Sequence, residues 1–279
     1  MIYQYREEYS VQAMSAYLGV SRSGYYAWRK RMDREDPDQQ RLDWVKTVYL
    51  QNRRVYGYRC VTYALRQKYG VKLNHKAVYR LMRKLGLRSV ARKRKFYKHV
   101  EQIPHLHHYP DLLQRNFSAA RPNQKWVTDI TYIQTRQGTL YLSVIKDLYD
   151  GFIVSHQTSS HNSVELVAAT LRQALSTQQV ANGLALHSDQ GRQYCSQEYF
   201  LLTQDHWISA SMSRPGNCLD NAAMENFFGH LKEEAIYRTK LQTFQHAQEV
   251  IDDYIHFYNY ERIQLKTKLT PFQQRCQFY

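Results

Sequence analysis

Three acidic residues stand in surroundings that favour metal-dependent phosphoryl transfer. Asp129 lies inside the strand-like run WVTDITYI, and Asp189 ends the short apolar run GLALHSD, although aspartate is disfavoured in strands. Glu225 lies in a predicted helix after SRPGNCLDN. Mg²⁺ is bound by oxygen ligands, and two such ions about 3.5–4 Å apart stabilise the attacking and leaving oxygens of a phosphoryl transfer. We therefore expect Asp129, Asp189 and Glu225 to be catalytic and to hold two Mg²⁺ ions, with Mn²⁺ as a substitute.

The helix that carries Glu225 is expected to begin near Asp220. Pro215 and Gly216 break the preceding structure, and the side chain of Asn217 or Asp220 can cap the free N–H groups of the first turn. The alternative is an ordinary amphipathic helix with a solvated glutamate and lysine.

The two faces of this helix have different roles in the prediction. Apolar residues recur every four positions from Ala223 to Leu231 and form the core side, while Glu225 lies about 200° from Ala223. Gly229 and Lys232 share the side of Glu225, so we expect Lys232 to contact a DNA phosphate. Two residues near the acids in sequence are expected to support the metal ligands, namely His187 and Asn221.

The sequences around the three acids resemble those of the DDE transposases and retroviral-type integrases. The resemblance lies in WVTDITYI, HSDQGRQY and SRPGNCLDNAAMENFFGHLK, with 35 residues between Asp189 and Glu225. It is strongest to insertion-sequence transposases that are encoded in a second reading frame, and it covers nearly the whole chain. It implies a bacterial protein that binds terminal inverted repeats and target DNA and performs Mg²⁺-dependent nicking and strand transfer. It also implies a homo-oligomer on DNA and leaves open a first-reading-frame product as a partner.

The resemblance also implies a ribonuclease-H-like α/β core, and the pattern of elements agrees with it. Three strands over 126–135, 139–149 and 152–159 form a predicted antiparallel meander. A helix over 163–178, a buried strand over 183–189, a helix over 197–206 and a strand over 207–213 follow, and together they predict a mixed five-stranded sheet. We therefore expect the first and fourth strands to be neighbours, so that Asp129 and Asp189 lie side by side with Glu225 packed across them.

The positive charge of the chain is concentrated in its first third. Residues 1–100 carry 24 Lys and Arg against 7 Asp and Glu, whereas residues 101–279 carry 15 against 17. Such a basic region favours nucleic acid as a partner. No apolar run approaches 18 residues and the N-terminus has no signal-peptide pattern, so we expect a cytoplasmic protein that associates with the nucleoid and not with a membrane.

The basic region contains two predicted helix-turn-helix units, over residues 1–36 and 37–90. Ser21 is expected to cap the second helix of the first unit, where Tyr25, Tyr26 and Trp28 are expected to pack. In the second unit, Gly70 is expected to end one helix and Asn74 to cap the next, which has the features of a recognition helix. The residues expected to contact DNA are Arg22, Lys76, Tyr79, Arg80, Arg83, Lys84, Arg92, Lys93, Arg94 and Lys95.

Three further regions complete the predicted domain organisation. Residues 91–124 form a basic, irregular linker, residues 125–240 the catalytic core, and residues 241–279 a C-terminal helix with a basic tail. The tail resembles the C-terminal signature of the same transposases at Tyr258, Asn259, Arg262 and Pro271. We expect Arg262 to bind phosphate or to stabilise a helix end.

Two other functions remain open from the sequence. A ribonuclease-H-fold nuclease would cut DNA without joining it, although the long basic region argues against this class. A DNA-binding regulator would carry an inert core and need a first-frame fusion for activity.

Overall fold

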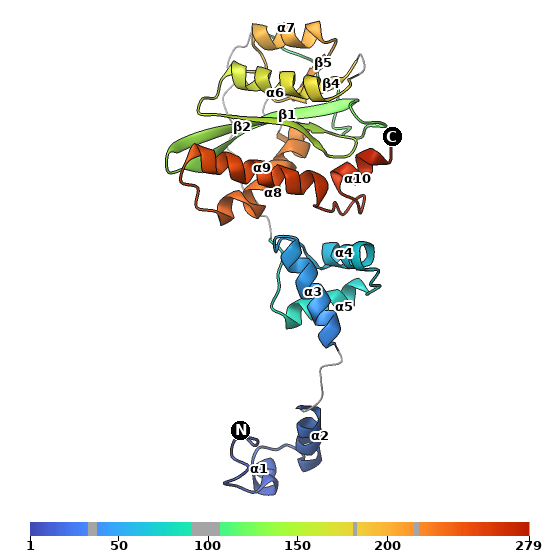
Figure 1. Ribbon diagram of the computed structural model, residues 1–279, viewed down its shortest axis with the longest axis vertical. Helices are drawn as coiled ribbons and strands as arrows, with labels where there is room; N and C mark the ends of the chain where they lie inside the picture. Colours follow the sequence, from blue (N-terminus) through green and yellow to red (C-terminus); the bar gives the residue numbers. More distant parts are fainter. Residues whose placement is uncertain (33–37, 91–106, 181–182, 215–217, 279) are drawn as a thin grey trace.

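A mixed five-stranded sheet with helices on both faces forms the larger part of the molecule (Figure 1). The computed structural model describes residues 1–32, 38–90, 107–180, 183–214 and 218–278. The sheet has the order β3-β2-β1-β4-β5, in which β1–β2 and β2–β3 pair antiparallel and β1–β4 and β4–β5 pair parallel. The strands are β1 (Lys125–Thr135), β2 (Gly138–Asp147), β3 (Ile153–Ser159), β4 (Ala185–Ser188) and β5 (Ser209–Met212).

Helices cover both faces of this sheet (Figure 1). On one face lie α6 (Val164–Thr177) and α7 (Gln197–Asp205), and on the other lie α8 (Ala222–Glu234) and α9 (Phe244–Tyr260). Ser163 caps α6 by accepting a hydrogen bond from the Leu166 N–H, as its sequence predicts. Shorter elements complete this part of the chain: η1 (Cys218–Asn221), η2 (Ile236–Arg238) and α10 (Pro271–Cys276).

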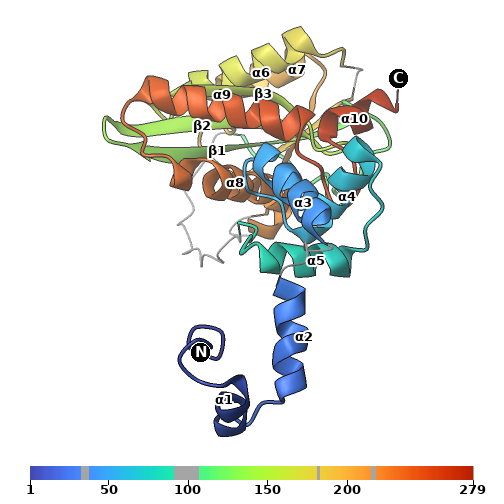
Figure 2. The same cartoon turned by 60° about the horizontal axis from the view of Figure 1, so that its bottom comes forward.

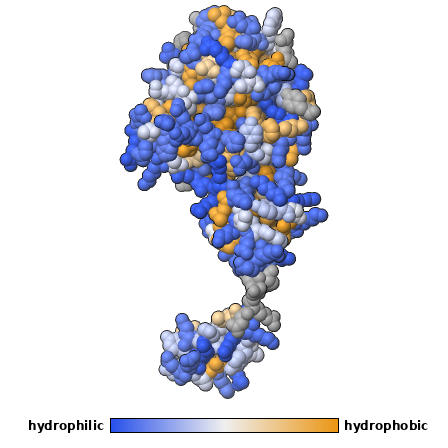
Figure 3. All heavy atoms as spheres, viewed as in Figure 1, coloured by the Kyte–Doolittle hydropathy of each residue, from blue (hydrophilic) through white to orange (hydrophobic). Residues whose placement is uncertain are grey.

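In the described part of the chain, helices α1 to α5 precede the sheet and form two units (Figures 1 and 2). The first unit holds α1 (Val11–Tyr17) and α2 (Arg22–Met32), and the second holds α3 (Gln39–Gln51), α4 (Tyr58–Tyr69) and α5 (His75–Lys84). The predicted caps are confirmed: Ser21 accepts from the Gly24 N–H, Gly70 ends α4 in the left-handed conformation, and Asn74 accepts from the Lys76 N–H. Hydrophilic residues dominate the surface of the first unit in Figure 3.

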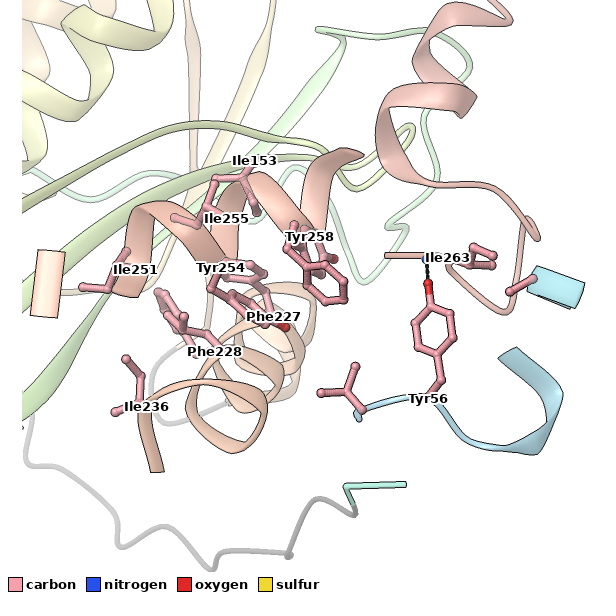
Figure 4. Packing of buried hydrophobic residues seen from close by; sticks show 14 of the residues in the cluster. Tyr56, Ile153, Phe227, Phe228, Ile236, Ile251, Tyr254, Ile255, Tyr258 and Ile263 are labelled. Carbon is pink, nitrogen blue, oxygen red and sulfur yellow. Dashed lines mark hydrogen bonds between the residues drawn. The ribbon is translucent and has the colours of Figure 1, made fainter. Parts of the chain in front are cut away.

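The second helical unit packs against the C-terminal part of the core. The Tyr56 hydroxyl accepts a hydrogen bond from the Ile263 N–H at 2.7 Å (Figure 4). It donates one to the Glu261 carbonyl at 3.1 Å. Arg53 forms an ion pair with Asp253 on α9. The buried residues of α3–α5 and those of α8 and α9 consequently belong to one continuous hydrophobic cluster.

The helix with Glu225 begins at Ala222, directly after the 3-10 turn η1 and two residues from the predicted start near Asp220. The predicted cap is wrong, because the N-cap is Asn221, whose side chain makes no capping hydrogen bond. Asp220 therefore does not cap it, and Asn217 lies outside the described residues.

The aromatic residues of α2 do not all pack. Tyr25 is buried, but Tyr26 and Trp28 remain 45% and 43% exposed although their rings touch that of Tyr25. Only Tyr25 has the packing role that its sequence predicts. Among the described residues, every helix is too short or too polar to cross a membrane.

Candidate active site

The sheet brings Asp129 and Asp189 to adjacent positions. β1 pairs in parallel with β4 up to Val127, which lies opposite His187, and each acid follows two residues later in its own segment. Parallel neighbours run in the same direction, so both acids lie where β4 ends. The predicted adjacency of the two strands is confirmed.

Glu225 approaches the same place from α8. Phe227 and Leu231 are fully buried on the core side of the helix, and α8 packs on β1, so Glu225 and Lys232 are left partly exposed. The face of the helix that was predicted to hold both side chains is therefore accessible to solvent.

The charges of these residues act on Asp129. Its pKa is raised well above the usual value, first by burial, then by the negative charge of Asp189 and also by that of Glu225. The positive charge of Lys232 and a hydrogen bond from the Ile130 N–H, at 2.7 Å, oppose this rise. Coulomb interactions weaken with distance, so Asp189, Glu225 and Lys232 lie close enough to Asp129 to change its pKa. We call these four residues the electrostatic site.

The three acids do not form a closed ligand cluster as they stand. Within the described residues, no three His, Cys, Asp or Glu side chains are arranged to hold one metal ion. Asp189 is exposed, and its Oδ1 accepts a hydrogen bond from the Gly191 N–H at 2.9 Å.

The composition of the site nevertheless fits Mg²⁺. All three candidate ligands carry carboxylate oxygens, the donors that this ion prefers. The negative charges of Asp189 and Glu225 add to the effect of burial in raising the pKa of Asp129. A divalent cation would relieve this repulsion.

Asn221 joins the two elements that carry Asp129 and Glu225. Its Nδ2 donates to the carbonyl of Thr128 at 3.3 Å, while its Oδ1 is buried and has no hydrogen-bond partner among the described residues. The residue thus fixes the start of α8 against β1, and its side-chain oxygen can accept a further hydrogen bond. This position suits the supporting role that its sequence predicts.

His187 has a different environment. Its two ring nitrogens lie 2.8 Å and 3.1 Å from the hydroxyls of Ser211 and Ser213, and Asp111 is 3.9 Å away. The imidazole is fully buried, and burial lowers its pKa. Its hydrogen bonds tie β4 to β5 and do not involve the three acids.

A buried carboxylate just before α8 was not recognised as an anchor from sequence. Asp220 accepts hydrogen bonds from Arg115 at 2.8 Å and from Arg214 at 2.9 Å, and these bonds hold its pKa well below the usual range. The pair of arginines fixes the segment that leads into α8. In sequence only an acid before a helix is visible, and that pattern indicated a cap.

Lys232 is held by a tyrosine of the first strand. Its Nζ lies 4.8 Å from the centroid of the Tyr132 ring, within the range of a cation–π interaction. Tyr132 was not among the predicted site residues. An aromatic residue three positions after Asp129 is the signal that the sequence offers.

The predicted DNA contacts of the helical units divide into three groups. Arg22 on α2 and Lys76, Tyr79, Arg83 and Lys84 on α5 are exposed. Arg80 is also exposed but forms an ion pair with Asp38 at 2.7 Å. Outside the described residues lie Arg92, Lys93, Arg94 and Lys95. A cavity of about 790 Å³ beside α5 is lined by residues that include Tyr58, Tyr79, Arg83 and Arg88.

The predicted C-terminal signature has a structural role. Arg262 forms an ion pair with Glu234 at the end of α8, at 2.7 Å. Asn259 donates to and accepts from the backbone of Ile153 on β3. The expectation that Arg262 stabilises a helix end fits this contact, which joins α8 to the segment after α9.

Known protein families match three parts of the chain. An integrase core domain matches residues 119–218 and again residues 225–278, and an HTH-like domain matches residues 36–95. The InsK protein of Escherichia coli strain K12, assigned as a transposase of insertion sequence element IS150, is 36% identical over 98% of this chain and 96% of its own length. The transposase InsF for insertion sequence IS3A, from the same organism, is 36% identical over 85% of this chain and 83% of its own.

A solved structure shows the same fold. A simian T-cell lymphotropic virus intasome, in complex with PP2A regulatory subunit B56 gamma, matches with a TM-score of 0.50 and 17% identity, over 83% of this chain and 74% of that one. The predicted α/β core with a preceding helix-turn-helix region is thereby confirmed. The chain belongs to the family of insertion-sequence transposases with an integrase core.

Proposed function

We propose that this protein binds the terminal inverted repeats of a mobile element and catalyses Mg²⁺-dependent nicking and strand transfer of DNA. The observation that carries the proposal is the electrostatic site of Asp129, Asp189 and Glu225, which come from two neighbouring strands and a helix. Membership of the transposase family supports the same chemistry.

The three acids are proposed to be catalytic and to hold two Mg²⁺ ions. When bound, such ions activate the attacking oxygen and stabilise the leaving 3′ oxygen. Glu225 is held at the site by the packing of α8 on β1 and by the Asn221 hydrogen bond to β1. Lys232 is proposed to contact a phosphate beside the scissile bond, because its charge already acts on Asp129. No covalent intermediate with the protein is required.

The helical units are proposed to recognise the DNA ends. Exposed cations and Tyr79 on α5 can enter a groove or contact flanking phosphates, as a recognition helix does. Two ends must be handled together, so a homo-oligomer on DNA is proposed. A first-reading-frame product is retained as a candidate partner.

The test is an assay with the full chain, labelled DNA that carries candidate end sequences, and Mg²⁺. We expect cut strands and strands joined to target DNA, and neither product with Asp189→Asn. Shuffled end sequences serve as the specificity control.

Two results would overturn the proposal. Cutting without joining would indicate a nuclease of the same fold. Specific binding without cutting or joining would indicate a regulator with an inert core.

A further inference from the structure

Tyr132 is an exposed aromatic residue in the second half of β1, where buried and exposed residues alternate. Its side chain is 60% exposed, whereas Thr131 and Ile133 on either side are buried. β4 pairs with β1 only from Lys125 to Val127, so within the described residues the later part of β1 has β2 as its one partner strand. Tyr132 therefore lies on a strand with an open edge, and its ring is on the opposite face of the sheet from the Asp129 side chain, because side chains three positions apart in a strand point to opposite faces.

One cation of the site lies against this ring. Lys232 projects from α8 two turns after Glu225, and its Nζ is 4.8 Å from the Tyr132 centroid. A cation at this distance is attracted by the negative face of the ring. The contact thus joins the strand of Asp129 to the helix of Glu225 through the ammonium group of Lys232.

We propose that Tyr132 is a positioning residue that holds the Lys232 ammonium where it meets a phosphate of the DNA strand to be cut or joined. This inference rests on the function proposed above. A lysine side chain has many rotamers in solution. If they are already restricted before DNA binds, less conformational entropy is lost when the reacting complex forms. The ring face supplies the restriction, so the tyrosine hydroxyl is dispensable.

A contact that is only structural would give a different result. If the pair only fastened α8 to β1, loss of the ring would lower the stability of the fold slightly and leave the rate constant of DNA cutting unchanged. A positioning role instead lowers kcat and does so only while Lys232 is present.

The experiment compares Tyr132→Phe, which keeps the ring, with Tyr132→Leu, which removes it. Tyr237→Leu is the matched control, because Tyr237 is 54% exposed outside the site. Single-turnover cutting of labelled end DNA is measured with Mg²⁺ over a range of DNA concentrations, in the wild-type and Lys232→Met backgrounds. Thermal unfolding verifies that each variant is folded.

We expect Tyr132→Phe to cut within about twofold of wild type and Tyr132→Leu to cut about tenfold more slowly at saturating DNA. In the Lys232→Met background, Tyr132→Leu should cause no further loss. Equal loss in both backgrounds, equal damage by Phe and Leu, or wild-type rates for Tyr132→Leu would each overturn the assignment. If wild type itself fails to cut, the proposed function fails; if wild type and Tyr132→Leu cut equally well, only the Tyr132 assignment fails.

Discussion

Asp129 occupies a position that is unfavourable for a folded chain and useful for binding a cation. Burial and two neighbouring acids disfavour its charged form, so its pKa lies well above the usual value. Keeping this carboxylate ionised at neutral pH therefore lowers the stability of the folded state. Strain of this kind is typical of functional sites, where groups are arranged for a ligand and not for stability.

Asp129→Asn is expected to raise the free energy of unfolding in metal-free buffer at pH 7, because it removes a carboxylate whose charged form is disfavoured by burial and by the negative charges of Asp189 and Glu225. The rates of DNA cutting and joining should fall by about 10³-fold, as they do when one member of a group of catalytic residues that act together is removed. Denaturant unfolding and the labelled-DNA assay measure the two effects. Asp205→Asn, at an exposed position at the end of α7, is the control. A less stable Asp129→Asn variant would contradict the electrostatic account.

The candidate acids could be predicted from sequence because their types conflict with their local surroundings. An aspartate in a strand and another at the end of a strand need an explanation that propensity does not supply. Tyr132 and the anchoring role of Asp220 could not be predicted in this way. Their partners, Lys232 and Arg115, lie 100 and 105 residues away in the chain, and only the folded structure brings them together.

At the scale of elements, α8 is held at both ends by polar contacts. Its start is fixed by Asn221 and Asp220, and its end by Glu234, which accepts hydrogen bonds from Arg262 and Tyr254. Burial raises the pKa of Glu234, but hydrogen bonds from His230 and Arg262 outweigh it and lower the value to about 2. The position of Glu225 thus depends on contacts outside the site.

Glu234→Gln is expected to lower the free energy of unfolding at pH 7 by about 3 kcal/mol, from a pKa of about 2 against the usual 4.5. Because the folded-state pKa is depressed, this stabilisation is complete above pH 4.5 and is lost as the pH falls toward 2. The difference between variant and wild type should therefore shrink over that range in denaturant titrations. Glu249→Gln, at an exposed position on α9, should show no such dependence. A constant difference from pH 7 to 3 would refute this assignment.

Most elements could be predicted because their apolar residues recur at the spacing typical of a strand or of a helix. The alternation in β1 and the four-residue period in α6 each match one type of element. α10 was missed because six residues with a proline at the start look like a tail. Its position is fixed by Arg275, which forms ion pairs with Asp147 and Asp150 at 2.7 Å, more than 120 residues away.

At the scale of the molecule, the second helical unit and the core are joined through Tyr56. Its hydroxyl meets the backbone N–H of Ile263 and the carbonyl of Glu261, in the segment that also carries Arg262 (Figure 4). DNA bound by α5 would thereby be placed relative to the sheet. A charge count in the sequence indicates that the first third binds DNA, but it cannot show this junction.

Tyr56→Phe is expected to lower the free energy of unfolding by about 1–3 kcal/mol, because it leaves the buried Ile263 N–H without its acceptor. Calorimetry or denaturant titration measures the change. Tyr69→Phe removes an exposed hydroxyl that bonds Gln51, and it should alter stability by less than about 0.5 kcal/mol. Equal effects of the two substitutions would argue against the junction.

The exposed cations of α5 should contribute unequally to DNA binding. Arg83→Gln is expected to reduce the slope of log affinity against log salt by about 0.9, the value for one lost phosphate contact. Arg80→Gln should reduce it less, because Arg80 is paired with Asp38. Fluorescence anisotropy with end DNA at several salt concentrations measures both. The same slope for Arg80→Gln and Arg83→Gln would contradict this difference.

The most direct measurement is a calorimetric titration of Mn²⁺ into the full chain bound to its end DNA. It compares wild type with Asp129→Asn, Asp189→Asn and Glu225→Gln. We predict saturable binding by wild type and a loss of at least about tenfold in affinity for each variant, since all three acids hold the same ions. Wild-type affinity in any one of the three would show that its carboxylate is not a ligand and would contradict the shared metal site.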